Sequence, residues 1–171
     1  MTVTISGFDL ENINASWDNL VHLDLSYTSL DGVMKVIRDA PLLETCSLLF
    51  ILPPADGFPT TPGTIIRHPQ IRMLEASSMD TSSGIVTALL DWLELPSLES
   101  CHICSHSSDR DSLRLDTVIS LIKRSGCSLK TLKVWSNALV YSTESEDMER
   151  LLRTVPHLRY RFTIFGLSCY Q

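Results

Sequence analysis

The chain has 171 residues, of which 44% are hydrophobic, and a formal net charge of −6. This length fits a single globular domain covering residues 1–171, and the negative charge without a Lys/Arg cluster excludes a general nucleic-acid binder. The longest apolar run, Leu48 to Leu52, is far shorter than the roughly 20 residues that cross a bilayer, and the N-terminus lacks the features of a secretory signal. We therefore expect neither a nucleic-acid nor a membrane partner.

An apolar pattern close to L-x-x-L-x-L occurs five times along the chain. The five stretches begin at Leu20, Leu43, Ile71, Leu98 and Leu129, and a degenerate sixth begins at Leu158. A proline stands two residues before three of them, at Pro41, Pro69 and Pro96, and Asp18 and Cys127 take that place in the other two. Alternating apolar residues predict a strand in each stretch. Most starts are about 20–29 residues apart, which is the spacing of leucine-rich repeats.

The segments between these strands mostly carry the apolar spacing of an amphipathic helix. Four stripes are expected: Leu30, Val33, Met34 and Ile37; then Ile85, Leu89, Trp92 and Leu93; then Leu115, Val118, Ile119 and Ile122; then Met148, Leu151, Leu152 and Val155. Lys123, Arg124 and Gly126 mark the end of the third helix, and Thr143 with Glu146 forms a plausible capping box before the fourth. The proline-rich run Pro53 to Pro59 cannot form a long helix, so we expect a loop there and a short helix near Thr61 to Arg67.

Strand patterns that alternate with helix patterns predict an α/β leucine-rich-repeat solenoid of about five strand–helix units, with a parallel sheet on its concave side. Val3 and Ile5 predict the strand of a truncated preceding repeat within residues 1–16. After Leu158 the apolar residues leave the repeat frame, so we expect a one-residue insertion or a cap there. A doubly wound α/β domain is the alternative. It is disfavoured because the strand motifs resemble one another and lack a glycine-rich turn into a helix.

The chain contains five cysteines, an odd number. Cys46 and Cys101 occupy the same inward strand position two repeats apart, so their backbones are expected about 10 Å from each other. A disulfide needs Cα atoms within about 7 Å. We therefore expect buried thiols and an intracellular location, in the cytoplasm or the nucleus.

Two clusters suggest chemistry. Cys101, His102, Cys104 and His106 contain the side chains that bind zinc, but strand alternation sends Cys101 inward and Cys104 outward, so they do not converge. The carboxylates between Glu144 and Glu149 lie at an expected helix start, where they complement the helix dipole. We expect no catalytic residue, no metal site and no cofactor, hence a non-enzymatic protein.

The outward residues of a parallel solenoid sheet form its natural contact surface. The candidate partner-binding residues are Asp24, Glu44, Glu75, Glu99, His102, Lys130, Lys133, Trp135 and Tyr160. Acidic residues dominate the first four strands, with Arg72 as an exception, whereas Lys130, Lys133, Arg159 and Arg161 make the end basic. This order predicts a charge gradient with Trp135 and Tyr160 as aromatic anchors. Alternatively, these are ordinary solvated strand residues.

The W-x-x-L-x-x-L-x-L opening from Trp17 to Leu25, the recurrent P-x-L-x-x-[LC]-x-[LIA] stretches and the long connection from Leu52 to Pro69 resemble the leucine-rich-repeat region of fungal F-box-like proteins. The resemblance covers roughly Trp17 to Leu158. It implies binding of a protein substrate for a cullin-type ubiquitin ligase, whose adaptor docks on an N-terminal helical F-box. No Leu-Pro-led F-box helix precedes the repeats in this sequence. A stand-alone repeat scaffold or inhibitor with no ligase role is the alternative.

Overall fold

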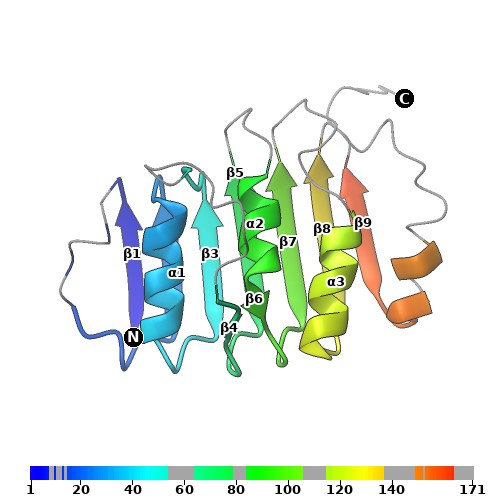
Figure 1. Ribbon diagram of the computed structural model, residues 1–171, viewed down its shortest axis with the longest axis horizontal. Coiled ribbons are helices and arrows are strands. Elements are labelled where there is room, and N and C mark those ends of the chain that lie inside the picture. The colour runs from blue at the N-terminus through cyan, green and yellow to red at the C-terminus, as the bar shows by residue number, and fades with distance from the viewer. Residues whose placement is uncertain are drawn as a thin grey trace.

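The computed structural model describes residues 1–7, 10, 13, 15–53, 64–78, 84–105, 115–136, 149–151 and 153–163, with only the backbone at 105, 136 and 160–163. The described part is a mixed α/β structure around one seven-stranded sheet (Figure 1). Its strands are β1 (Thr2–Ser6), β2 (His22–Ser26), β3 (Thr45–Leu49), β5 (Met73–Ser78), β7 (Ser100–Ser105), β8 (Thr131–Ser136) and β9 (Arg159–Thr163). All neighbours pair in parallel, and the strand order follows the chain order.

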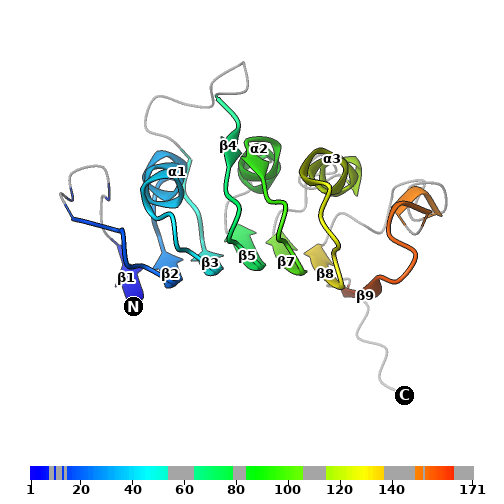
Figure 2. The ribbon, with the colours of Figure 1, turned by 90° about the horizontal axis from the view of Figure 1, so that it is seen from below.

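The helices all lie on one face of this sheet. They are α1 (Leu30–Asp39), α2 (Ile85–Asp91) and α3 (Leu115–Ser125), and a short helical segment at 149–151 and 153–154 follows α3. Figure 2 shows the sheet as a shallow arc whose hollow side faces away from the helices. A parallel pair needs a crossover between its strands. In the described part of the chain the helices of these crossovers lie on one face, which leaves the other face of the sheet uncovered by them.

The prolines that precede the strands sit in tight turns. A backbone hydrogen bond closes the turn from Ala40 to Leu43 at 3.1 Å and the turn from Leu95 to Leu98 at 3.1 Å. Pro41 and Pro96 occupy the second position of these turns, where the fixed φ of proline is favourable. The turn from Trp17 to Leu20 closes in the same way at 3.0 Å, with Asp18 in the proline position. The Pro-x-Leu motifs before β3 and β7 therefore start these strands at equivalent places, and the turn with Asp18 does the same for β2.

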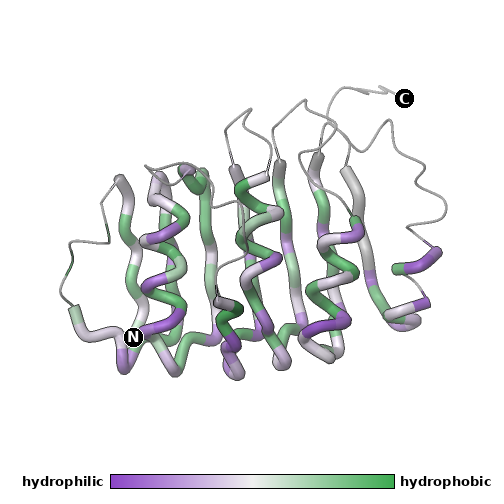
Figure 3. The backbone as a smooth tube through the Cα atoms, in the orientation of Figure 1, coloured by the Kyte–Doolittle hydropathy of each residue, from purple (hydrophilic) through white to green (hydrophobic). Residues whose placement is uncertain are grey.

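The register confirms the inward and outward alternation expected from the sequence. One inward row contains Leu23, Cys46, Leu74, Cys101 and Leu132, and the next contains Leu25, Leu48, Ala76, Ile103 and Val134. Every one of these residues is at most 2% exposed. The same alternation is visible as changes of hydropathy along the strands in Figure 3. The strand expected around Val3 and Ile5 is β1, whose inward residues are only partly buried at the sheet edge.

Two of the predicted helical stripes are confirmed. Leu30, Val33, Met34 and Ile37 of α1 are buried, and so are Leu115, Val118, Ile119 and Ile122 of α3. Ser29 caps α1 by accepting a hydrogen bond from the Gly32 amide at 3.1 Å. Gly126 follows α3 with φ +60°, the left-handed geometry of a helix C-terminus.

The expected second stripe is only partly helical. Helix α2 ends at Asp91, and Leu93 belongs to a two-residue strand, β6 (Leu93–Glu94). Of the fourth stripe, Leu151 and Val155 are buried, whereas Met148, the side chain of Leu152 and the capping box at Thr143 and Glu146 lie outside the described part.

The short helix expected near Thr61 to Arg67 is wrong where the structure describes that segment. Residues 61–63 lie outside it, and Ile66–Arg67 forms strand β4, which pairs with β6 on the helix side of the main sheet, beside α2 (Figure 2). The Ile66 amide donates to the Trp92 carbonyl at 2.8 Å, and the His68 amide donates to the Glu94 carbonyl at 2.9 Å. Pairing with a segment distant in sequence decides this conformation, which local periodicity does not reveal.

The spacing between the leading leucine and the last strand is one residue shorter than in the preceding repeat, whereas the sequence suggested an extra residue. The register pairs Thr131 with Arg159 and Leu132 with Tyr160. Leu132 lies three residues after Leu129, whereas Tyr160 lies two residues after Leu158. The expected insertion is therefore a deletion, which brings Tyr160 into register with Leu132 and Phe162 into register with Val134.

Candidate functional site

The sheet face opposite the helices presents three outward rows of side chains. We call them the first row (His22, Thr45, Met73, Ser100 and Thr131), the middle row (Asp24, Ser47, Glu75, His102 and Lys133) and the last row (Ser26, Leu49, Ser77, Cys104 and Trp135). These rows occupy the outward positions expected from the alternation within the L-x-x-L-x-L strands. Among the described elements, none lies over this face in Figure 2.

Three charged residues that directly precede strands, Arg72, Glu99 and Lys130, form ion pairs with one another. The Arg72 guanidinium lies 3.5 Å from the Glu99 carboxylate, and the Lys130 ammonium lies 2.7 Å from the same group. The hydrogen bond and charge of Lys130, followed by the charge of Arg72, lower the pKa of Glu99. The charges of Arg72, Glu99 and Lys130 therefore alternate in sign. The predicted gradient from acidic to basic residues does not hold for Glu99 and Lys130.

The middle row keeps the predicted order of charge. Asp24 and Glu75 carry the acidic side, Lys133 carries the basic side, and the register places Arg161 opposite Lys133. Ser47 donates to the Glu75 carboxylate at 3.4 Å. His102 lies between the acidic Glu75 and the basic Lys133 in this row. Burial, followed by the positive charge of Lys133, lowers its pKa although Glu75 opposes the effect.

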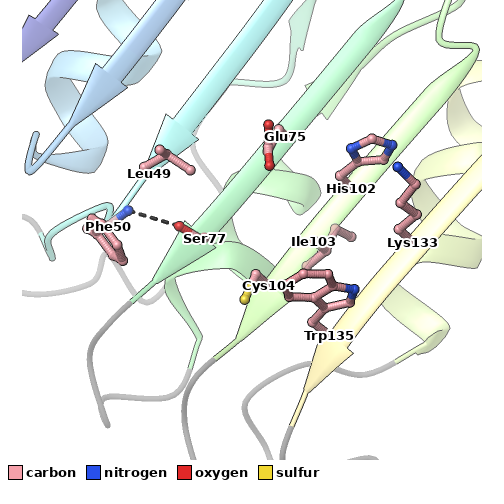
Figure 4. Close-up of a pocket in the computed structure, with 9 residues that line it drawn as sticks. All are labelled: Leu49, Phe50, Glu75, Ser77, His102, Ile103, Cys104, Lys133 and Trp135. Atoms are coloured by element: carbon pink, nitrogen blue, oxygen red, sulfur yellow. Dashed lines mark hydrogen bonds between the residues drawn. The ribbon is translucent and has the colours of Figure 1, made fainter. Parts of the chain in front are cut away.

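A groove opens across the middle and last rows at the C-terminal ends of the strands (Figure 4). Its volume is about 370 Å³, and its lining residues are Leu49, Phe50, Glu75, Ser77, His102, Ile103, Cys104, Lys133 and Trp135. Phe50 and Leu49 form one end, and the indole of Trp135 lies at the other beside Cys104. Burial, and secondarily the charge of Glu75, raises the pKa of the Cys104 thiol, so at neutral pH it is an uncharged part of the lining.

The backbone at the Phe50 end of the groove has an unusual conformation. Tyr27 and Phe50 have φ angles of 57° and 58°, in the left-handed region that non-glycine residues avoid. Each directly follows a strand, and their ring centroids lie 5.1 Å apart. The Phe50 amide donates to the Ser77 hydroxyl at 3.0 Å, which fixes the turn beside the groove (Figure 4).

The groove brings together four of the nine candidate residues, namely Glu75, His102, Lys133 and Trp135. Asp24 lies on β2 and Glu44 directly precedes β3, both nearer the N-terminus, and Glu99 and Lys130 form an ion pair with each other just before β7 and β8. Tyr160 pairs in register with buried Leu132, so it does not share the row of Trp135, and its side chain lies outside the described part.

Sequence reasoning did not identify Leu49, Phe50 and Tyr27 as part of a site. One signal was present, because Leu49 is apolar at an outward strand position within the run Leu48 to Leu52. Apolar residues that gather on the solvent side of a sheet indicate a contact surface, although a single one does not. The left-handed turn that presents Phe50 had no such signal, since glycine normally occupies that geometry.

The cysteine–histidine cluster does not form a metal site among the described residues, in which no group of three or more potential ligands converges. Cys101 is buried in the core, where burial, followed by the charge of Cys127, raises its thiol pKa to about 12. Cys46 is also a buried free thiol with a pKa raised to about 12, by burial and then by Asp24. His106 lies outside the described part.

None of the helices in the described ranges has both the length and the apolar character needed to span a bilayer. No family model matches the sequence, and searches of curated proteins and of solved structures returned no significant match.

Proposed function

We propose that this chain is a leucine-rich-repeat solenoid that binds another protein through the open face of its parallel sheet, without catalysing a reaction. Three features support the solenoid: the recurrent L-x-x-L-x-L motif, the strand order that follows the chain, and the helices on one face. Stacked strand–helix units of this kind present extended concave surfaces.

The observation that carries the binding function is the groove at the C-terminal ends of the strands. Trp135 is 42% exposed on the sheet face, and Leu49 and Phe50 stand across the groove from it. Apolar and aromatic side chains gathered in a hollow and bordered by opposite charges are typical of protein interfaces. Ordinary solvated strand residues would not explain this gathering.

Partner capture tests this function. The double variant Lys130→Glu/Lys133→Glu reverses two charges on the sheet face, whereas Lys123→Glu changes one exposed charge on α3, on the helix side. We expect proteins captured in cells by cross-linking to be lost from the double variant and retained by Lys123→Glu, with unchanged circular dichroism. Equal capture by all three proteins would contradict the binding function.

The more specific role that we propose is substrate recognition for an F-box type ubiquitin ligase, which rests on the sequence resemblance. Its test is purification of the full-length gene product with quantitative mass spectrometry. Co-purification of a cullin-type ligase and its adaptor would support this role. Capture of a partner through the sheet face without these subunits would favour a stand-alone scaffold or inhibitor.

A further inference from the structure

We propose that the groove between Phe50 and Trp135 binds an extended peptide segment of the partner, in which a bulky apolar side chain is flanked by acidic residues. This inference rests on the proposed binding function and names the chemistry of the segment that is bound. The apolar side chain would lie between the rings of Phe50 and Trp135, and the acidic residues would lie toward Lys133 on β8.

The first argument comes from three equivalent turns. Gly7, Tyr27 and Phe50 each follow one of the first three strands with φ angles of 71°, 57° and 58°. The Gly7 amide bonds to the Ser26 carbonyl at 2.9 Å, and the Tyr27 amide bonds to the Leu49 carbonyl at 3.1 Å. Glycine makes this turn without strain after β1, so the turn itself does not require an aromatic residue.

The strained aromatic residues therefore point to a role outside the turn. Non-glycine residues held in the left-handed region cluster at ligand-binding sites, where the surrounding structure maintains them. Phe50 lines the groove directly, and Tyr27 packs against Phe50 with 47% of its own surface exposed. Phe50, supported by the ring of Tyr27, forms an apolar wall at one end of the groove, and the exposed indole of Trp135 lies at the other end (Figure 4).

The groove has room for one large side chain and its backbone rather than for a whole secondary-structure element. Its volume is about 370 Å³, at the lower end of the roughly 300–1,000 Å³ of ligand pockets. The floor between the aromatic walls consists of Ser77 and Cys104, which are small and uncharged at neutral pH. An apolar residue on an extended segment fits this shape.

Charge sets the orientation of the segment. Glu75 borders the groove on the β5 side and Lys133 borders it on the β8 side. The neighbouring Lys130 is paired with Glu99 at 2.7 Å, whereas Lys133 is the cation among the described lining residues of the groove. A segment whose acidic residues lie on the β8 side complements this order, whereas the opposite order places like charges together.

A library of short random peptides displayed on phage is the probe that tests this inference. We expect selection on the immobilised protein to enrich peptides that combine a Leu, Phe or Trp with neighbouring Asp or Glu. Synthetic fluorescein-labelled versions should bind in fluorescence polarisation, and Phe50→Gly, Trp135→Ala and Lys133→Glu should each weaken binding by about tenfold or more. Lys123→Glu on α3 is the charge control and should bind like the wild type.

Phe50→Gly is suited to this test because glycine already makes the equivalent turn at Gly7, so the fold is retained. Circular dichroism and the urea midpoint of every variant verify this. Enriched peptides that bind Phe50→Gly and Trp135→Ala as tightly as the wild type would overturn the groove inference and leave the broader binding function standing. Enrichment of basic peptides, or of none, would overturn it as well.

Sedimentation equilibrium separates the other possible occupant, a second copy of the chain. Self-association that disappears in Phe50→Gly would assign the groove to a dimer contact and overturn the peptide proposal. Failure of the broader function has a different signature, because capture of cellular partners would then be insensitive to every sheet-face variant, including Lys130→Glu/Lys133→Glu.

Discussion

At the scale of single residues, Phe50 has a backbone conformation that favours glycine, although its aromatic ring lines the groove. A left-handed backbone costs a non-glycine residue about 1–2 kcal/mol, and the Phe50 ring offsets part of this cost through contact with Tyr27. Neighbouring Leu49 occupies an ordinary strand conformation on the same groove wall. The two positions should therefore respond in opposite ways to glycine and alanine.

We expect Phe50→Gly to be more stable than Phe50→Ala by about 1 kcal/mol, because alanine keeps the strain and glycine removes it. At Leu49 the order should reverse, with Leu49→Ala more stable than Leu49→Gly by about 0.5–1 kcal/mol. Urea unfolding monitored by circular dichroism measures both differences. The same order at both positions would show that the backbone at Phe50 is unstrained.

His102 gives a prediction for pH. Its pKa in the folded protein lies below the ordinary value of 6.5, chiefly because of burial and then Lys133. As pH falls below about 6.5, the unfolded chain takes up the proton before the folded protein does, so the free energy of unfolding decreases. The decrease should stop once pH falls below the folded pKa.

Replacement by glutamine checks this assignment. In His102→Gln the loss of stability over that pH window should be smaller than in the wild type, and the two proteins should show the same pH dependence above it. Urea midpoints measured across the window provide the comparison. Identical slopes at all pH values would exclude His102 as the titrating group.

At the scale of secondary-structure elements, neighbouring units are joined by polar contacts as well as by the core. Arg124 near the end of α3 donates through Nε to the Leu93 carbonyl at 3.0 Å and through Nη2 to the Leu90 carbonyl at 2.7 Å. It thereby caps carbonyls at the C-terminal end of α2 and in β6. His68 likewise joins β4 to the end of α1, through a 2.8 Å hydrogen bond from its Nε2 to the Ala40 carbonyl.

Removal of the Arg124 contacts should loosen the contact between α2 and α3. We expect Arg124→Met to lower the free energy of unfolding by about 1.5–3 kcal/mol, because charge-assisted hydrogen bonds are lost while the apolar stem is kept. Lys123→Met, at an exposed position one residue earlier, should change it by less than about 0.5 kcal/mol. Equal effects in thermal or urea unfolding would contradict the capping role.

At the scale of the whole molecule, burial differs between the middle of the sheet and its β1 edge. Ile103 in β7 is 2% exposed, whereas Ile5 in the same inward row of β1 is only partly buried. Ile5 lies in an edge strand with one neighbour, and Ile103 lies between two strands. Apolar contacts should therefore contribute less to stability at the β1 edge.

A matched pair of truncations tests this difference. Ile103→Ala should lower the free energy of unfolding by about 2–5 kcal/mol, since it leaves a cavity in the core. Ile5→Ala should cost less than about 1.5 kcal/mol, because the side chain is only partly buried and already has some contact with water. Hydrogen exchange in the wild type should likewise be faster in β1 than in β5 or β7. Equal costs for the two truncations would contradict this distribution of stability.

The sequence by itself determined which strand residues face inward and which face outward, because apolar side chains must leave water at every second position of a half-buried strand. It also determined the stripes of α1 and α3 and the outward position of Trp135. Only the tertiary structure decided the pairing of β4 with β6, the one-residue deletion before β9, the ion pairs around Glu99 and the left-handed turn at Phe50. The physical reason is that periodicity records contact with water, whereas these features depend on contacts between residues distant in sequence.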